Sequence, residues 1–310
     1  MRLAAIDIGT NSTKMTLADV SDDGALSVVA EESDVTRLGE GVDAARRLGE
    51  AAMSRTLDAV VRFADAARKR GAEVVLGAGT SALRDAANGP DFIAQVKSRA
   101  GVDVQIISGD REAALAYAAV RSDTGLGLPA DVPLLVFDIG GGSTELILGD
   151  GAGVGRHKSL DIGAVRLTER FLHSDPPTAA ELAQAAGYAR AAFDTFPLPG
   201  TPLRVTGIGG TAVNVAAVTQ GRAKPDLDSL HGATLARADV SAALDRFDRL
   251  PLAERREIPS LEPKRADVIV AGALILDILL TYFQSDRFTL STHGLRYGLL
   301  ADYAKAKTRG

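Results

Sequence analysis

An internal repeat is the feature of this sequence that most limits its fold. IDIGTNSTKMTLAD at residues 6–19 aligns without a gap to FDIGGGSTELILGD at residues 137–150, and seven of the fourteen positions are identical. In each copy an apolar strand ends on an aspartate, and a turn rich in glycine and hydroxyl side chains leads into a second strand. A spacing this long indicates a duplicated domain rather than a solenoid of short repeats.

Strand and helix patterns alternate through most of the chain, which favours an α/β fold with largely parallel sheets. Residues 3–8 and 134–139 are expected to form the first strand of the two copies. We predict domain I over residues 1–126 and domain II over residues 127–310, and the last helix, about 294–310, could pack back on domain I. The boundary lies in a segment rich in glycine and proline.

Composition excludes several classes of protein. The chain has no cysteine, which excludes disulfides, a thiol nucleophile and cysteine-ligated zinc or iron–sulfur sites. A net charge of -5 disfavours a generally basic surface for nucleic acid. The most apolar segment, residues 268–280, is shorter than a membrane span and contains Asp277. We therefore expect a cytoplasmic protein that binds neither nucleic acid nor membrane.

The repeated strand-turn-strand has the residues of a phosphate-binding loop. Small residues let backbone N–H groups approach an anion closely, and serine and threonine hydroxyls add donors. The aspartate at the strand end can hold Mg²⁺, which prefers oxygen ligands. Two such loops facing each other across a cleft would hold a phosphate chain and its metal. A tight hairpin without a ligand is the alternative for one copy, and is less favoured for two matched copies.

Segments outside the repeat, taken together with it, resemble those of a known protein family. With GIGGTAVNV (207–215) as a third glycine loop, the chain resembles the actin, sugar-kinase and Hsp70 superfamily. The segments that narrow the resemblance are IISGDREAALAY (106–117), SLDIGAVRLTERF (159–171), KRADVIVAGALIL (264–276) and THGLRYGLL (292–300). These resemble the Ppx/GppA phosphatases, which comprise exopolyphosphatases and guanosine pentaphosphate phosphohydrolases. The resemblance implies the short form of that family, with two duplicated actin-like (ribonuclease H-like) domains and an interdomain cleft.

The resemblance also assigns roles to particular residues. Glu112 matches the family's general base, which would orient and deprotonate the attacking water. Asp138 and Glu145 match an acidic pair and, with Asp7, are the predicted ligands of Mg²⁺ or another divalent cation. Arg84 matches an arginine expected to hold the terminal phosphate. The other predicted phosphate-binding residues are Thr10, Asn11, Ser12, Gly140, Gly141, Gly142, Ser143, Gly209, Gly210 and Thr211.

Several residues keep two interpretations. Arg111 stands where the family often has a second acid, and it could either bind phosphate beside the base or lower the pKa of Glu112. A channel for an anionic polymer needs cations beyond the catalytic centre. Five basic residues are candidates for this role, and the alternative interpretation of each is a solvated charge on the surface. These candidates are Lys158, Arg166, Lys264, Arg265 and Arg296. The four histidines are scattered, so their spacing does not argue for a metal.

The leading functional hypothesis is a Mg²⁺-dependent exopolyphosphatase that releases orthophosphate from the end of inorganic polyphosphate. Conversion of pppGpp to ppGpp breaks the same kind of bond, so the sequence leaves that substrate open. An actin-like ATP-binding kinase or assembly protein is the alternative from a different class. A non-catalytic sensor of polyphosphate or an alarmone is a further alternative. A homodimer is a possible assembly.

Overall fold

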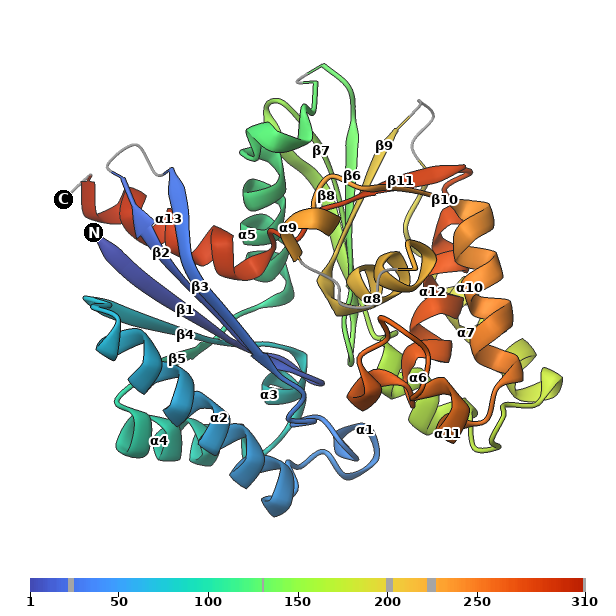
Figure 1. Cartoon of the computed structure of the whole chain (residues 1–310), viewed down its shortest axis with the longest axis horizontal. Helices are drawn as coiled ribbons and strands as arrows, with labels where there is room; N and C mark the ends of the chain where they lie inside the picture. Colours follow the sequence, from blue (N-terminus) through green and yellow to red (C-terminus); the bar gives the residue numbers. More distant parts are fainter. Residues whose placement is uncertain (22–24, 130, 199–202, 222–226, 309–310) are drawn as a thin grey trace. The chain divides into compact units, whose positions relative to one another are not determined.

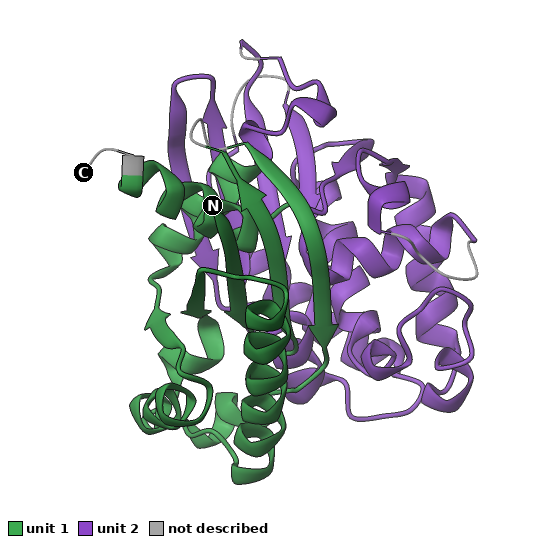
Figure 2. Ribbon diagram, turned by 60° about the vertical axis from the view of Figure 1, so that its left-hand side comes forward, with its two compact units in different colours: residues 1–119, 293–310 green, residues 120–292 purple. Residues whose placement is uncertain are grey.

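The chain divides into two compact units, each built on its own β-sheet. The computed structural model describes residues 1–21, 25–129, 131–198, 203–221 and 227–308. Unit 1 comprises residues 1–119 and 293–310, and unit 2 comprises residues 120–292 (Figure 2). The chain first passes from one unit to the other within a helix, a few residues before the boundary that the glycine-rich and proline-rich segment predicted.

Unit 1 contains a five-stranded sheet (Figure 1). Its strands are β1 (Arg2–Ile8), β2 (Thr13–Val20), β3 (Leu26–Asp34), β4 (Val74–Gly79) and β5 (Asp103–Ile106). Its helices are α1 (Val42–Ala45), α2 (Glu50–Lys69), α3 (Ser81–Asp85), α4 (Gly89–Ala100), most of α5 (Gly109–Arg121) and α13 (Leu295–Thr308). The strand order is β3-β2-β1-β4-β5. β1 pairs antiparallel with β2 and parallel with β4, which is parallel to β5.

Both faces of the unit 1 sheet are covered, which explains why β1 is almost continuously apolar. On one face, Ala4 and Ile6 belong to a core cluster with residues of α2 and α4, among them Phe63 and Phe92. On the other face, a second cluster joins Leu3 and Ala5 to Leu300 and Ala304 of α13. The last helix therefore packs on the first sheet.

Unit 2 contains a six-stranded sheet and most of the helices that follow it. Its strands are β6 (Leu134–Ile139), β7 (Thr144–Asp150), β8 (Gly153–Leu160), β9 (Arg204–Ile208), β10 (Thr234–Ala236) and β11 (Arg287–Leu290). Its helices are η1 (Thr124–Leu126), α6 (Ala164–Phe171), α7 (Ala179–Phe193), α8 (Gly209–Thr219), α9 (Leu227–Leu230), α10 (Arg237–Arg249), α11 (Leu252–Arg255), η2 (Pro263–Arg265) and α12 (Ile269–Tyr282). The strand order is β10-β11-β9-β6-β7-β8.

The duplication extends from fourteen residues to whole sheets. The order β3-β2-β1-β4-β5 corresponds strand by strand to β8-β7-β6-β9-β11, and β10 extends the second sheet by one antiparallel edge strand. The second strand of each copy has a register irregularity at aligned positions, between Leu17 and Ala18 and between Leu148 and Gly149. The mixed α/β architecture with two sheets predicted from the repeat is thus confirmed.

The most apolar segment of the chain forms α12, and its side chains lie in the core of unit 2. Asp277, which interrupts this segment, accepts a hydrogen bond from Ser241 Oγ of α10 at 2.5 Å. Within the described ranges, none of the helices combines the length and the apolar character needed to cross a bilayer.

Candidate active site

The first repeated turn joins β1 to β2 in unit 1. Gly9 N–H donates to Ser12 O at 3.0 Å and closes the turn. Gly39 N–H donates to Thr10 O at 2.8 Å, and a Cβ at Gly39 would lie only 2.2 Å from Thr10 Cγ2. The three residues predicted to face phosphate are buried: Thr10, Asn11 and Ser12. Because Gly39 has no side chain, its backbone can approach Thr10 closely and hold the turn by a hydrogen bond.

Asp7, at the end of β1, has the environment of a cation ligand. It lies opposite Lys14 in the register of β1 and β2. Its Oδ1 atom is buried and has no hydrogen-bond partner among the described residues. Burial raises the pKa of the Asp7 carboxyl, and the charges of Lys14 and Arg296 offset part of that rise. A buried carboxylate oxygen without a donor is costly unless a cation compensates it, so Asp7 fits a divalent-metal ligand.

The predicted base, Glu112, lies in the first turn of α5 and is held by Arg84 of α3. Arg84 Nη1 lies 2.7 Å from Glu112 Oε2 and donates to Ile107 O at 3.0 Å. The two side chains are 21% and 12% exposed, so water screens the pair only in part. Arg84 is also the arginine predicted to hold phosphate, and in this structure its Nη1 atom contacts the predicted base.

Arg111 precedes the base but forms its ion pair elsewhere. Its guanidinium pairs with the carboxylate of Asp302 on α13. Both of these side chains are about half exposed. The sequence left two interpretations open for Arg111, and the structure adds a third, an ion pair between α5 and α13.

The second repeated turn joins β6 to β7 in unit 2 and closes in the same way, with Gly140 N–H donating to Ser143 O at 3.0 Å. The start of α6 then binds the carbonyl groups of this turn. Val165 N–H donates to Gly141 O at 2.9 Å, and Arg166 Nε donates to Gly142 O at 2.7 Å. A Cβ at Gly163 would lie 2.4 Å from Gly141 O. Close approach of α6 therefore requires glycine at 163, which sequence reasoning missed.

Two carboxylates flank the second turn. Asp138 and Glu145 are opposite each other in the register of β6 and β7. Glu145 is 3% exposed, and its Oε1 accepts hydrogen bonds from Ser143 Oγ at 2.7 Å and Ser159 Oγ at 2.8 Å. These hydroxyls fix the carboxylate in place. Two neighbouring carboxylates at a glycine-rich turn, one of them held by two hydroxyls, fit a hard cation such as Mg²⁺.

The third glycine loop lies against Asp138. A Cβ at Gly209, where φ is +87°, would be 2.0 Å from Asp138 Oδ1. The loop is also tied to the end of β6, because Thr211 Oγ1 donates to Ile139 O at 3.0 Å. The structure therefore brings together the residues predicted from the second and third loops.

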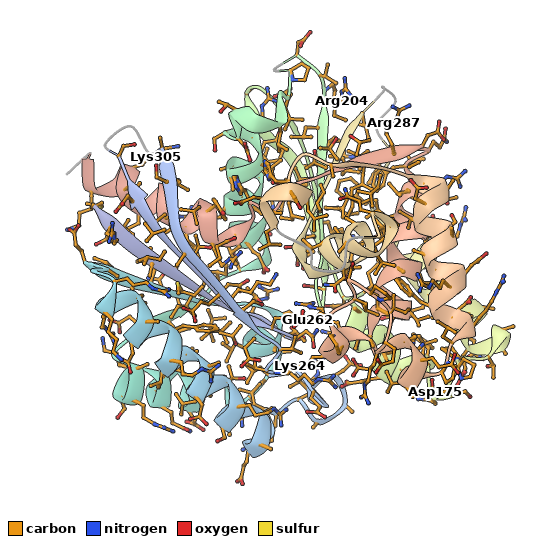
Figure 3. The ribbon with its side chains drawn as sticks, viewed as in Figure 1. Asp175, Arg204, Glu262, Lys264, Arg287 and Lys305 are labelled. Carbon is orange, nitrogen blue, oxygen red and sulfur yellow. The ribbon has the colours of Figure 1, made fainter. Side chains whose placement is uncertain are left out.

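A partly buried polar network supports the third loop, and the sequence did not indicate it. Asn214 Nδ2 donates to Gly210 O at 2.9 Å, and Glu262 N–H donates to Asn214 Oδ1 at 3.0 Å. Arg265 Nε donates to Glu262 Oε2 at 2.7 Å. A Cβ at Gly210 would lie 2.4 Å from Arg265 Nη1, so the guanidinium contacts the loop backbone. Figure 3 labels Glu262 and Lys264 on this segment.

The surface-charge interpretation is wrong for three of the five candidate cations. Arg166, Arg265 and Arg296 are 6%, 9% and 9% exposed. Arg296 donates to Met15 O at 3.3 Å and pairs with Glu31 at 3.0 Å, so it is part of the support of the unit 1 sheet. Lys264 is exposed.

Each unit gathers its predicted residues at one edge of its sheet. In unit 1 the first turn, α3 with Arg84, and α5 with Glu112 follow the carboxyl ends of β1, β4 and β5. In unit 2 the second turn and the third loop follow the carboxyl ends of β6 and β9. Carboxyl ends of parallel strands meet at the same sheet edge, which is where ligands bind in open α/β sheets.

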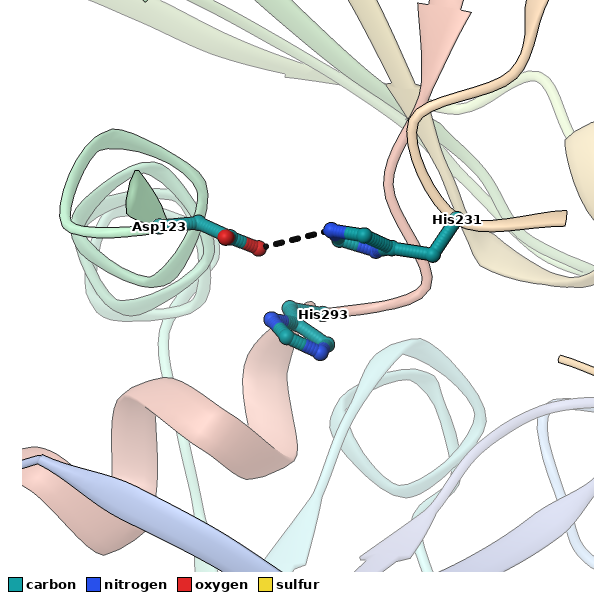
Figure 4. A group of neighbouring side chains, drawn as sticks. All are labelled: Asp123, His231 and His293. Atoms are coloured by element: carbon teal, nitrogen blue, oxygen red, sulfur yellow. Dashed lines mark ion pairs between the residues drawn. The ribbon is translucent and has the colours of Figure 1, made fainter. Parts of the chain in front are cut away.

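One histidine forms a polar link that its sequence position did not suggest. His231 Nε2 lies 3.1 Å from Asp123 Oδ2, and Figure 4 marks this ion pair. His231 Nδ1 lies 3.1 Å from Thr292 Oγ1. Thr292 N–H donates to His231 Nδ1 at 3.3 Å, so this ring nitrogen is a hydrogen-bond acceptor.

Comparison with known proteins identifies relatives along the whole chain. The sequence profile of the Ppx/GppA phosphatase family matches residues 5–307. Exopolyphosphatase 2 of Mycobacterium tuberculosis is 34% identical over 319 residues, covering 98% of this chain and 98% of that protein. The guanosine-5'-triphosphate,3'-diphosphate pyrophosphatase of Vibrio cholerae is 33% identical over 298 residues, covering 96% of this chain and 58% of that protein.

Solved structures of the same family share the fold. A Ppx/GppA family member from Aquifex aeolicus superposes with a TM-score of 0.82 at 32% identity, covering 99% of this chain and 98% of that one. An exopolyphosphatase-like protein superposes with a TM-score of 0.92 at 33% identity and the same coverage.

Proposed function

Because the chain belongs to the Ppx/GppA phosphatase family, we propose that it hydrolyses the terminal phosphoanhydride bond of inorganic polyphosphate and releases orthophosphate. Membership confirms two sequence predictions, the duplicated actin-like fold and the enzyme class of phosphoanhydride hydrolases. The preference for polyphosphate is supported by two similar proteins. One is the exopolyphosphatase that is 34% identical over 98% of this chain, and the other is the exopolyphosphatase-like protein that superposes with a TM-score of 0.92. pppGpp is the second candidate substrate.

The observation that carries the proposal is the fixed carboxylate of Glu112. Hydrolysis needs a base that takes a proton from water while the water oxygen attacks the terminal phosphorus. Arg84 holds Glu112 Oε2 at 2.7 Å, so the carboxylate has one orientation at the edge of the sheet. The new bond joins the water oxygen to phosphorus, the bridging P–O bond breaks, and the proton moves to Glu112. The shortened chain leaves with the electron pair of the broken bond.

The residues of the three loops would bind the phosphate oxygens. Backbone N–H groups and hydroxyls of the two repeated turns, with the third loop, supply neutral donors suited to an anion. Asp138 and Glu145 of unit 2 are proposed ligands of a divalent cation. Asp7 of unit 1 is also a proposed ligand, supported by its buried Oδ1, which has no hydrogen-bond partner among the described residues. When bound, Mg²⁺ would neutralise charge on the phosphate oxygens.

The proposal is tested by measuring phosphate release from long-chain polyphosphate, pppGpp and ATP in parallel, with Mg²⁺ and with EDTA. We expect Mg²⁺-dependent release from polyphosphate, with pppGpp as the alternative, and little release from ATP. Phosphorylation of a small molecule by ATP would favour the kinase alternative. Binding of polyphosphate without release would favour the sensor.

A single substitution then tests the base. Glu112→Gln should reduce the rate by about 10²-fold or more while the protein stays folded. Glu257→Gln, at an exposed position outside the proposed site, is the matched control and should keep wild-type activity. A wild-type rate for Glu112→Gln would remove this residue from the mechanism.

A further inference from the structure

Helix α13, far from α5 in sequence, contacts the helix that carries the proposed base. Arg111, the residue before Glu112, forms an ion pair with Asp302 of α13. Four residues form a buried cluster at the same junction: Ala78 of β4, Ile107, Leu115 of α5 and Leu295 of α13. Ile107 also accepts a hydrogen bond from Arg84 through its carbonyl oxygen. The cluster thus connects α13 to the Arg84–Glu112 pair.

Gly298 of α13 lies directly against the backbone of α5. A Cβ at this position would lie 2.2 Å from Leu115 O and 2.7 Å from Leu115 C, whereas real Cβ contacts do not occur below 3.0 Å. Glycine inside a helix is destabilising relative to alanine. Here it allows the backbone of α13 to touch the backbone of α5. Leu115 is one helical turn after Glu112, so any displacement of α5 at Leu115 also displaces the base.

We propose that Gly298 and Asp302 of α13 are positioning residues that set the location of Glu112. Gly298 sets the distance between the helices by the absence of a side chain, and Asp302 holds the first turn of α5 through Arg111. Neither residue touches substrate in this proposal, since both act through α5. The inference rests on the proposed function, because it needs Glu112 to act as the base.

Gly298→Ala is the direct test. The added methyl group must push α5 away, and displacements near 1 Å at a reacting group reduce rates by about 10²-fold. We expect kcat to fall about 10- to 100-fold, with KM within about twofold of wild type because the phosphate-binding turns are untouched. Circular dichroism and thermal unfolding establish that the variant is folded. A folded Gly298→Ala protein with wild-type kcat would overturn the role of Gly298.

The ion pair gives a second test that does not depend on the folding of Gly298→Ala. Half-exposed ion pairs contribute little, so Arg111→Ala and Asp302→Ala should each lower kcat by about 1.5- to fivefold. The double variant should be no slower than either single variant, since one pair is lost in each. Asp302→Glu should recover activity. The proposal for Asp302 would be contradicted if the two single substitutions had multiplicative effects on kcat in the double variant, or if neither substitution changed kcat.

A second ion pair in unit 1, with similar exposure, is the control for the loss of any surface ion pair. Arg99 and Asp58 pair at 3.4 Å between α4 and α2, with side chains 57% and 55% exposed against 50% and 48% for Arg111 and Asp302. Their alanine variants should keep wild-type kcat. If the wild type releases no phosphate, or Glu112→Gln is fully active, the proposed function fails. If only the α13 variants match wild type, the positioning role alone fails.

Discussion

Arg84 donates from one nitrogen, Nη1, to both Glu112 Oε2 at 2.7 Å and Ile107 O at 3.0 Å. The carbonyl group anchors the guanidinium to the segment before α5, and the guanidinium in turn anchors the carboxylate. A charge-assisted bond of this length is stronger than a neutral one and restricts both side chains. Arg84 and Glu112 therefore act as one element of the site, and their contributions to the rate should not be independent.

Arg84→Gln should slow phosphate release by about 10²-fold, because the carboxylate loses its fixed orientation and its charged partner. The double variant Arg84→Gln/Glu112→Gln should be about as slow as Glu112→Gln alone, which steady-state kcat measurements can show. Multiplied losses in the double variant would mean that Arg84 has a separate function, such as holding the terminal phosphate.

The repeat could be found in the sequence because it is local. Asp7 and Asp138 each precede a glycine-containing turn, and the pattern of a strand, a turn and a second strand is complete within fourteen residues. The alternation of apolar and turn residues then sufficed to predict two α/β sheets.

The contacts between distant segments could not be found in this way. Arg84 and Glu112 meet because β4 and β5 are parallel neighbours, and α13 meets α5 because the end of the chain returns to the first sheet. A sequence pattern carries no information on which arginine meets which carboxylate. Strand β10 was missed for another reason: with three residues, it is too short to show a period of two.

Asp7→Asn should change stability and activity in opposite directions. Burial disfavours the charged carboxylate, and asparagine removes that charge at almost constant shape. We expect stabilisation of about 1 kcal/mol at pH 7 in urea unfolding, a usual size for a single stabilising change. Phosphate release should fall strongly if Asp7 binds the cation.

Asp19→Asn is the control for Asp7→Asn in the same pair of strands. Asp19 is exposed, and its ion pair with Arg2 holds the pKa of Asp19 below its ordinary value. Its replacement should not stabilise the protein and should leave activity unchanged. Equal effects of the two substitutions on stability would show that burial of Asp7 is not the cause.

Gly209→Ala should be harmful because the added methyl group has no space, and Gly221→Ala is the control for the effect of backbone strain alone. At Gly209 a methyl group meets Asp138 Oδ1 at 2.0 Å, and φ is +87°. At Gly221 φ is +64°, but nothing lies within 4 Å of a Cβ. Both alanines carry backbone strain of about 1 kcal/mol. Only Gly209→Ala should add a further loss of about 1–3 kcal/mol and displace Asp138.

Thermal unfolding and phosphate release of the two alanine variants measure this difference. Gly221→Ala should be mildly destabilised and remain active, whereas Gly209→Ala should be less stable and nearly inactive. Similar activity in both variants would contradict the close contact between the third loop and Asp138.

The start of α7 should make the stability of unit 2 depend on acid pH. Hydrogen bonds from the N–H groups of Thr178 at 2.7 Å and His173 at 3.0 Å lower the pKa of Glu181 to about 2 from 4.5. A lowered carboxyl pKa stabilises the fold above the unfolded value and loses that effect as pH falls. The contribution of Glu181 is therefore complete above pH 4.5 and disappears toward pH 2.

Glu181→Gln should lower the urea midpoint at pH 7, and the difference from wild type should shrink as the pH falls below 4.5. Glu50→Gln is the matched control, because Glu50 also lies in a first helical turn, but α2 has no side-chain cap at its start. Its effect at pH 7 should be smaller. A constant difference between Glu181→Gln and wild type from pH 7 to pH 3 would show that the carboxylate charge is not what stabilises the start of α7.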